Sequence, residues 1–129
     1  MGLFNTIFGS KENEEKGAIV NWIPLNSLKQ IEVIKKQSKT ETIFIFKHST
    51  SCGVSSMVIK RFEKLFDESM MNIKIYYLDL LNFRNVSDEV GYDFQVMHQS
   101  PQLLVIRNEV AVLNLSHYEI TNINIQKYL

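Results

Sequence analysis

Short β-branched apolar runs alternate with amphipathic helical stretches along this chain, and this alternation constrains the fold more than any other feature. The clearest pair is residues 42–47, TIFIFK, which are typical of a central strand buried on both faces, and residues 53–69, whose apolar side chains recur at helical spacings. Strands and helices that alternate in this way favour a mixed sheet with helices on both faces. The sequence therefore predicts an α/β fold.

The remaining segments continue the same order. Apolar runs predict further strands at residues 19–22, 73–78, 103–107 and 110–115. Helices are predicted from a Ser27 cap to about residue 37 with Leu28, Ile31 and Ile34 on one face, at residues 85–92, and from a Thr121 cap to the C-terminus. A tight turn at Asn108–Glu109 makes the last two strands an antiparallel hairpin. The resulting order is βαβαβαββα, with a mixed sheet of four to five strands.

Length and composition are those of one globular domain. The chain has 129 residues, of which 45% are hydrophobic, and this is enough to bury a single core. The charge cluster at residues 11–16 shows no helical or strand period. We therefore expect a mobile N-terminal lead-in at residues 1–17 and one domain at residues 18–129.

Charge and hydropathy exclude several classes of function. The 14 Lys and Arg residues balance the 14 Asp and Glu residues, so no net field attracts nucleic acid. The apolar runs are far shorter than the roughly 20 residues of a membrane-spanning helix. Residues 1–10 also lack the features of a secretory signal. We therefore expect a cytoplasmic protein with no nucleic-acid or membrane partner.

The single cysteine of the chain, Cys52, lies between the strand at residues 42–47 and the helix that begins near Gly53. The free N–H groups and the positive dipole end of a helix stabilise an anion, so a thiol at this place ionises more easily and becomes a better nucleophile. Gly53 leaves room for a partner sulfur to approach. Ser55 stands where a C-x-x-C pair has its second cysteine, and it can offer its hydroxyl or its backbone N–H to the thiolate.

Two other interpretations of Cys52 are a buried apolar filler and a metal ligand. Unpaired cysteine is among the most buried residue types. However, the neighbouring side chains are polar, which is a poor environment for a filler: Ser49, Thr50, Ser51, Ser55 and Ser56. One cysteine with three scattered histidines offers no zinc-binding spacing. We therefore expect a reactive thiol and no metal site.

Two further features stand near the predicted strand ends. Ser100–Pro101 comes just before the strand at residues 103–107, and a cis bond there would turn the preceding backbone outward. His48 lies four residues before the cysteine, where a protonated imidazole would stabilise the thiolate; a surface histidine at a strand end is the alternative. His98 and His117 have no such neighbour, and we expect them to be structural or solvated.

This order of strand, cysteine, helix, proline and hairpin resembles the thioredoxin superfamily from residue 19 onward. More narrowly, FKHSTSCGVS at residues 46–55 is similar to the cysteine loop of the monothiol bacilliredoxin family, the redox proteins of the bacillithiol system. SPQLLVI at residues 100–106 also resembles that family. Family members more commonly have T-C-P-I-S at the cysteine, whereas this chain has Gly53 in place of the proline.

The resemblance implies a thioredoxin-like thiol-disulfide oxidoreductase that removes bacillithiol from mixed disulfides on client proteins, with Cys52 as the attacking residue and Ser55 beside it. Pro101 would carry the family's cis-proline, and Ser100 would supply backbone hydrogen bonds to the bound cysteinyl group. Gly53 and Val54 would line the same site.

Bacillithiol, or a similar low-molecular-weight thiol, would then be the co-substrate, and no cofactor would be bound. The malate carboxylates of bacillithiol favour basic neighbours, for which Lys47 and His48 are the candidates. The alternative is a thioredoxin-fold binding or adaptor module whose thiol is regulatory or non-catalytic.

Overall fold

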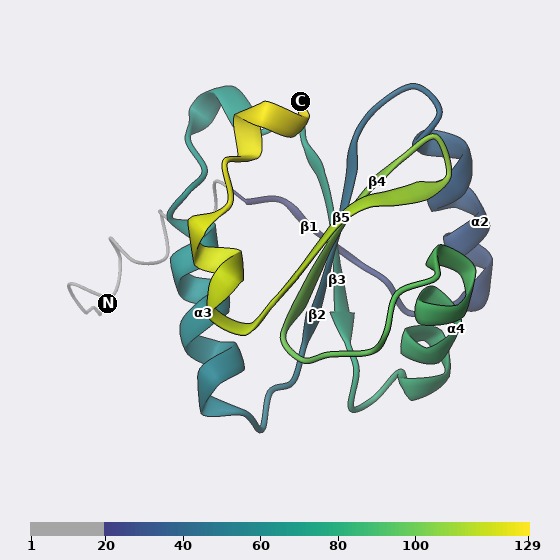
Figure 1. Cartoon of the computed structure of the whole chain (residues 1–129), viewed down its shortest axis with the longest axis horizontal. Coiled ribbons are helices and arrows are strands. Elements are labelled where there is room, and N and C mark those ends of the chain that lie inside the picture. Colours follow the sequence, from purple (N-terminus) through teal and green to yellow (C-terminus); the bar gives the residue numbers. More distant parts are fainter. Residues whose placement is uncertain (1–19) are drawn as a thin grey trace, which may run out of the picture.

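A computed structural model describes residues 20–129, and its centre is one mixed sheet of five strands (Figure 1). The strands are β1 (Trp22–Pro24), β2 (Ile43–His48), β3 (Lys74–Asp79), β4 (Gln102–Arg107) and β5 (Val110–Ser116). Their spatial order is β1-β3-β2-β4-β5. Strands β1 and β2 both run parallel to β3, β4 is antiparallel to β2, and β5 is antiparallel to β4. The predicted α/β fold with a mixed sheet is confirmed.

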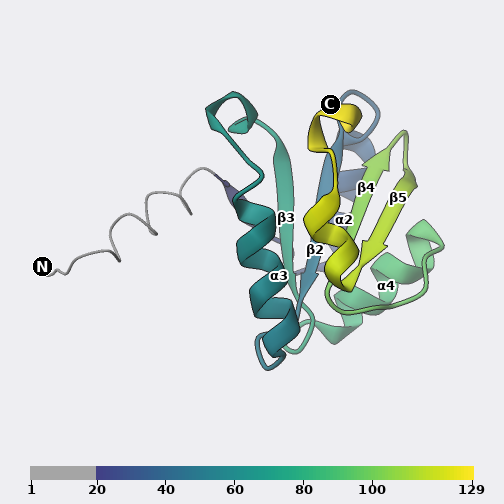
Figure 2. The same cartoon turned by 60° about the vertical axis from the view of Figure 1, so that its left-hand side comes forward.

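Helical segments cover both faces of this sheet (Figure 2). One face carries helix α3 (Gly53–Glu63) and two 3-10 segments, η2 (His117–Asn122) and η3 (Ile125–Tyr128). The other face carries helices α2 (Leu28–Gln37) and α4 (Arg84–Phe94). A short 3-10 segment, η1 (Glu68–Met70), follows α3. The sheet is therefore the middle of three layers, and each face has its own apolar core.

Strand β2 connects the sequence pattern to these two cores. All of its residues are buried, as expected of a central strand. Its phenylalanines lie in the core under α3, and its isoleucines lie in the core under α2 and α4. Successive side chains of a strand point to opposite faces. Lys47 therefore faces α4, and His48 faces α3.

The hairpin of β4 and β5 is confirmed, and its turn has a distinctive backbone. Asn108 and Glu109 both have positive φ angles, of 51° and 70°. Two such residues between antiparallel strands match the type I′ turn, whose twist fits the twist of the strands it joins. The Ser38 hydroxyl accepts a hydrogen bond from the Glu109 backbone N–H at 2.9 Å, which ties the turn to the end of α2.

Two elements differ most from their predicted bounds, the first strand and helix α3. The first strand covers Trp22–Pro24 instead of residues 19–22, because Pro24 occupies the last position of an edge strand, where no ladder donor is needed. Helix α3 ends at Glu63 instead of continuing to residue 69. The Asp67 side chain accepts the Ser69 backbone N–H and starts the separate segment η1, which competes with a longer helix.

The predicted C-terminal helix is wrong. Thr121 lies inside η2 and donates its hydroxyl to the Tyr118 carbonyl, so it does not cap a helix. The buried side chains of this segment, Ile120, Ile123 and Ile125, meet the core from two successive 3-10 turns.

Two further expectations concern the N-terminal part of the chain. In α2, Ile31 and Ile34 are fully buried, whereas Leu28 is 48% exposed. The expected lead-in at residues 1–17 lies outside the described residues.

Candidate active site

Cys52 is the N-cap residue of helix α3, with an extended backbone at φ −106° and ψ 120°. Its N–H donates to the Ser49 carbonyl at 3.2 Å, and its carbonyl accepts the Ser56 N–H at 3.1 Å. The thiol is half-buried. The N–H groups of the first helical turn lack intrahelical acceptors, although the Cys52 side chain forms no capping hydrogen bond with them. The structure therefore places the thiol at the positive end of the α3 dipole, as the sequence predicts.

The surface beside the thiol is open at Gly53. This residue is exposed, and a Cβ atom built on it would meet nothing within 4 Å. The first helical position also accepts proline, whose missing N–H costs no helical hydrogen bond there. Glycine at this position therefore leaves the backbone less restricted than proline would. Val54, next in the chain, is half-buried and packs against the core under α3.

The Ser55 hydroxyl is bonded away from the thiol. Its side chain is fully buried, accepts the Ser49 backbone N–H at 3.1 Å, and lies 2.7 Å from Nδ1 of His48. A hydroxyl has a single proton to donate. When Nδ1 of His48 is unprotonated, that proton is used in the bond to His48. The expectation that the Ser55 hydroxyl donates to the thiolate is therefore not met, and Ser55 instead joins the first turn of α3 to the end of β2.

His48, the partner of the Ser55 hydroxyl, is buried. It is 6% exposed, and its ring lies near those of Phe46 and Tyr77, with centroids 6.4 Å and 5.6 Å away. Burial lowers the pKa of His48 below its usual 6.5, although the Asp79 carboxylate opposes this shift. His48 is therefore neutral near pH 7. Neither interpretation of His48 is met: desolvation disfavours a protonated imidazole, and the ring is buried instead of lying at the surface.

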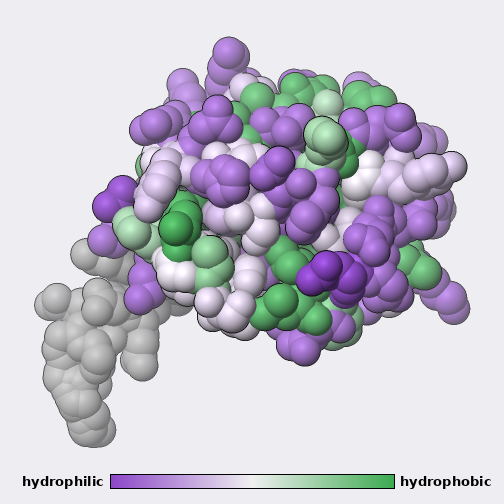
Figure 3. Space-filling model, turned by 60° about the horizontal axis from the view of Figure 1, so that its bottom comes forward, coloured by the Kyte–Doolittle hydropathy of each residue, from purple (hydrophilic) through white to green (hydrophobic). Residues whose placement is uncertain are grey.

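Ser100–Pro101 lies at the same end of the sheet as Cys52, where strand β2 ends and strand β4 begins. The peptide bond is cis, as expected, and Pro101 is buried. Lys47 of β2 pairs with Gln102 of β4, and the next antiparallel step beyond this pair brings His48 opposite Pro101. The backbone before β4 therefore runs beside the turn that carries the cysteine. Figure 3 views the molecule from this end of the sheet. Pale residues of near-neutral hydropathy and small green hydrophobic areas lie there among purple hydrophilic residues.

Lys47 does not lie at that surface. Its side chain is fully buried on the face of the sheet that α4 covers, and its Nζ donates to the Ser87 carbonyl at 3.1 Å. Burial lowers the pKa of Lys47 from 10.5 to about 8, against the attraction of Asp88. The expectation that Lys47 and His48 offer basic groups to a malate carboxylate is therefore wrong. Both side chains are inside the protein, and they point to opposite faces of the sheet.

The contacts of two residues near Pro101, His98 and Gln102, were not predicted from the sequence. His98, which was expected to be structural or solvated, has its Nδ1 3.4 Å from Lys47 Nζ. Gln102 is fully buried and donates from Nε2 to the Met97 carbonyl at 2.9 Å. The sequence does hold a sign of the Gln102 contact, because this glutamine begins an otherwise apolar buried strand and buried polar side chains are nearly always hydrogen-bonded.

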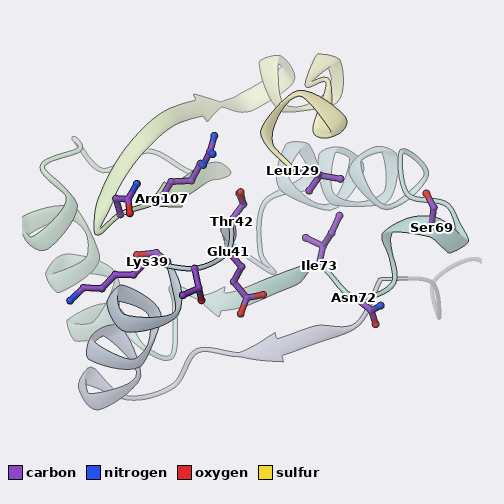
Figure 4. A pocket seen from close by; sticks show the side chains of 11 residues that line it. Lys39, Glu41, Thr42, Ser69, Asn72, Ile73, Arg107 and Leu129 are labelled. Carbon is purple, nitrogen blue, oxygen red and sulfur yellow. The ribbon is translucent and has the colours of Figure 1, made fainter.

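A cavity of about 470 Å³ lies at the opposite end of the sheet, where β2 begins and β4 ends (Figure 4). Residues that line it include Lys39, Glu41, Thr42 and Arg107. The cavity is therefore separate from the end of the sheet that carries Cys52.

Within residues 20–129 there is no group of three or more His, Cys, Asp or Glu residues that could hold a metal ion. No helix in that part of the chain is long and apolar enough to cross a membrane.

Comparisons with known proteins agree with this geometry. Residues 23–125 match the family model described as "Monothiol bacilliredoxin BrxC". A solved structure of a candidate oxidoreductase with a thioredoxin fold is 29% identical, with 77% of this chain and 85% of that chain covered and a TM-score of 0.66. A Malassezia sympodialis thioredoxin is 17% identical, with 81% and 88% covered and a TM-score of 0.65. A Schistosoma mansoni thioredoxin is 16% identical, with 84% and 99% covered and a TM-score of 0.66. The fold is the thioredoxin fold.

Proposed function

The chain belongs to the monothiol bacilliredoxin family of thioredoxin-fold thiol oxidoreductases, and we propose that it removes bacillithiol from mixed disulfides on protein cysteines. The observation that carries this proposal is the place of Cys52, which is half-buried at the N-cap of helix α3, beside an open surface at Gly53. A helix N-terminus is a favourable place for a nucleophilic sulfur, and the open surface at Gly53 lets a partner sulfur reach it.

In the first step, the Cys52 thiolate attacks the bacillithiol sulfur of the mixed disulfide. A sulfur–sulfur bond forms between Cys52 and bacillithiol, and the bond between bacillithiol and the client cysteine breaks. The client cysteine leaves with the electron pair as a thiolate and takes a proton from water. The client protein is thereby returned to its free thiol form.

In the second step, the thiolate of a free bacillithiol molecule attacks the bacillithiol sulfur that is bound to Cys52. Bacillithiol disulfide is released, and Cys52 is regenerated as a thiolate. An external thiol is needed because Cys52 is the only cysteine of the chain and no second thiol can resolve the mixed disulfide from within. Bacillithiol is thus proposed as a co-substrate, with no bound cofactor.

Backbone groups complete the proposed site. The main chain of Ser100 would hydrogen-bond the cysteinyl group of the client next to Pro101, while Gly53 and Val54 line the approach to the sulfur. Ser55 keeps the cysteine turn in place through its bonds to Ser49 and His48.

We place the activity in the cytoplasm, since a lone thiol suits a reducing compartment.

The test uses a client protein whose single surface cysteine carries bacillithiol. Incubation with this chain should move one bacillithiol onto Cys52 and free the client thiol, both read by intact-mass spectrometry. Added free bacillithiol should then remove the group from Cys52, and the Cys52→Ser variant should take up none. If the wild-type thiol is alkylated rapidly by iodoacetamide but takes no bacillithiol from the client, the proposal fails. A binding module with a non-catalytic thiol is then the better account.

A further inference from the structure

Lys47 and Gln102 form a polar pair inside an apolar layer. They are register partners on the adjacent strands β2 and β4, and both side chains are fully buried. The next side chains on the same face of these strands, Ile45 and Leu104, belong to the apolar core under α2 and α4. Burying a lysine side chain costs free energy that an apolar residue of similar size would not. Core packing alone therefore does not account for this pair.

Both side chains contact the segment of residues 97–101, which we call the docking loop: Gln102 bonds to its backbone, and Lys47 contacts the His98 side chain. Lys47 Nζ lies 3.4 Å from His98 Nδ1 as well as 3.1 Å from the Ser87 carbonyl of α4. Burial lowers the pKa of His98, and the Lys47 and Arg84 charges lower it further, so Nδ1 of a neutral His98 can accept from the ammonium. Gln102 donates to the Met97 carbonyl at 2.9 Å and accepts the Gln99 N–H at 3.4 Å.

At its end the docking loop is also held by the buried Pro101, whose carbonyl accepts the His117 N–H at 3.0 Å, but residues 97–99 are exposed. Met97 is 85% exposed, and His98 and Gln99 are also exposed. Their side chains therefore contribute little apolar burial to hold the backbone in place. The loop leads directly into Ser100–Pro101, the backbone that the proposed function assigns to binding the client cysteinyl group. The exposed part of the loop, residues 97–99, is thus contacted from inside the protein by two polar side chains.

We infer that Lys47 and Gln102 are positioning residues, which hold the docking loop so that the Ser100–Pro101 backbone receives a protein substrate beside Cys52. The inference rests on the proposed function for the use of that backbone. Neither residue touches the reacting sulfur atoms, because Lys47 and Gln102 lie on the α4 face of the sheet, whereas Cys52 caps a helix on the other face. Their loss should therefore weaken substrate binding without changing the reactivity of the thiol.

The experiment compares the variants Lys47→Met and Gln102→Leu with Lys36→Met, which removes an exposed lysine from α2. The substrate is a peptide whose single cysteine carries bacillithiol, and transfer to Cys52 is followed over a range of peptide concentrations. We expect KM to rise about tenfold in the first two variants, as when a positioning contact is lost, with kcat and the iodoacetamide alkylation rate unchanged. The control should match the wild type.

A second readout is amide hydrogen exchange. It should become faster at residues 97–100 in both variants and stay unchanged in α3. An unchanged KM in a folded variant overturns the inference, and so does a raised KM without faster exchange in the docking loop. If Lys47→Met does not fold, Gln102→Leu carries the same test. If wild-type protein accepts no bacillithiol, the proposed function fails, and the exchange data alone then decide whether the two residues hold the loop.

Discussion

The Ser55 hydroxyl lies 2.7 Å from Nδ1 of His48, and this contact joins the first turn of helix α3 to the last residue of strand β2. Cys52 lies between these two residues in the chain. The serine that stands in the place of a second cysteine therefore acts as an internal anchor for the cysteine turn. Its hydroxyl is used within the protein, in bonds to Ser49 and His48.

Ser55→Ala should lower the free energy of unfolding by about 1–3 kcal/mol, because it leaves the buried Ser49 N–H and the His48 ring nitrogen without their partner. Urea denaturation followed by the fluorescence of Trp22, the single tryptophan, measures the change. Ser56→Ala, on the same helical turn, is the matched control and should stay within about 0.5 kcal/mol of the wild type. Equal effects of the two substitutions would mean that the hydroxyl contributes nothing special.

His48 should make the protein less stable in mild acid. Burial lowers the pKa of His48 below 6.5, so the unfolded chain binds a proton more readily than the folded one. Stability is therefore lost as the pH falls through about 6.5 and below it. The groups that face the ring are the Asp79 carboxylate, Tyr77 and the Ser55 hydroxyl.

The variant His48→Asn retains an acceptor for Ser55 and removes the titration. The stability of wild type minus that of the variant should fall between pH 7.5 and pH 5, as measured by urea denaturation at several pH values. A difference that stays constant over this range would show that His48 does not titrate differently in the folded and unfolded states.

Lys47→Met should be at least as stable as the wild type at pH 7, because it removes a buried charge. The folded-state pKa of Lys47 is lowered from 10.5 to about 8, so the folded protein releases this proton earlier than the unfolded chain does. The wild type therefore gains stability relative to the variant as the pH rises from about 8 towards 10.5. Denaturation at pH 7, 8.5 and 10 should show the advantage of methionine shrinking; a growing advantage would contradict it.

Glu109→Gly should raise the free energy of unfolding by about 0.5–1 kcal/mol, because φ is 70° at this position and glycine adopts positive φ without strain. The substitution removes the Glu109 ion pair with Lys39, which is exposed and contributes little. Lys39→Met is the control for that loss. A Glu109→Gly variant that is less stable than Lys39→Met would show that the turn is not strained.

Much of the fold could be predicted because its signals are local. The buried run at residues 42–47 became the central strand β2, and the helical spacing after Cys52 became α3. The N-cap position of the thiol follows from the meeting of those two patterns. The C-terminal segment failed for a related reason: its isoleucines mark burial, but their spacing does not distinguish an α-helix from successive 3-10 turns packed on a core.

The partners of the polar side chains could not be predicted from the chain alone. Lys47 and His48 are neighbours in the sequence, yet one reaches the docking loop under α4 and the other reaches Ser55 in α3. Alternation along a strand separates two such side chains, but what covers each face depends on how the helices cross the sheet. Local sequence was sufficient for the strand, the thiol and the helix that presents it. The burial of Lys47 and His48, and hence their charge, was decided by tertiary packing, because desolvation depends on distant segments that close over a residue.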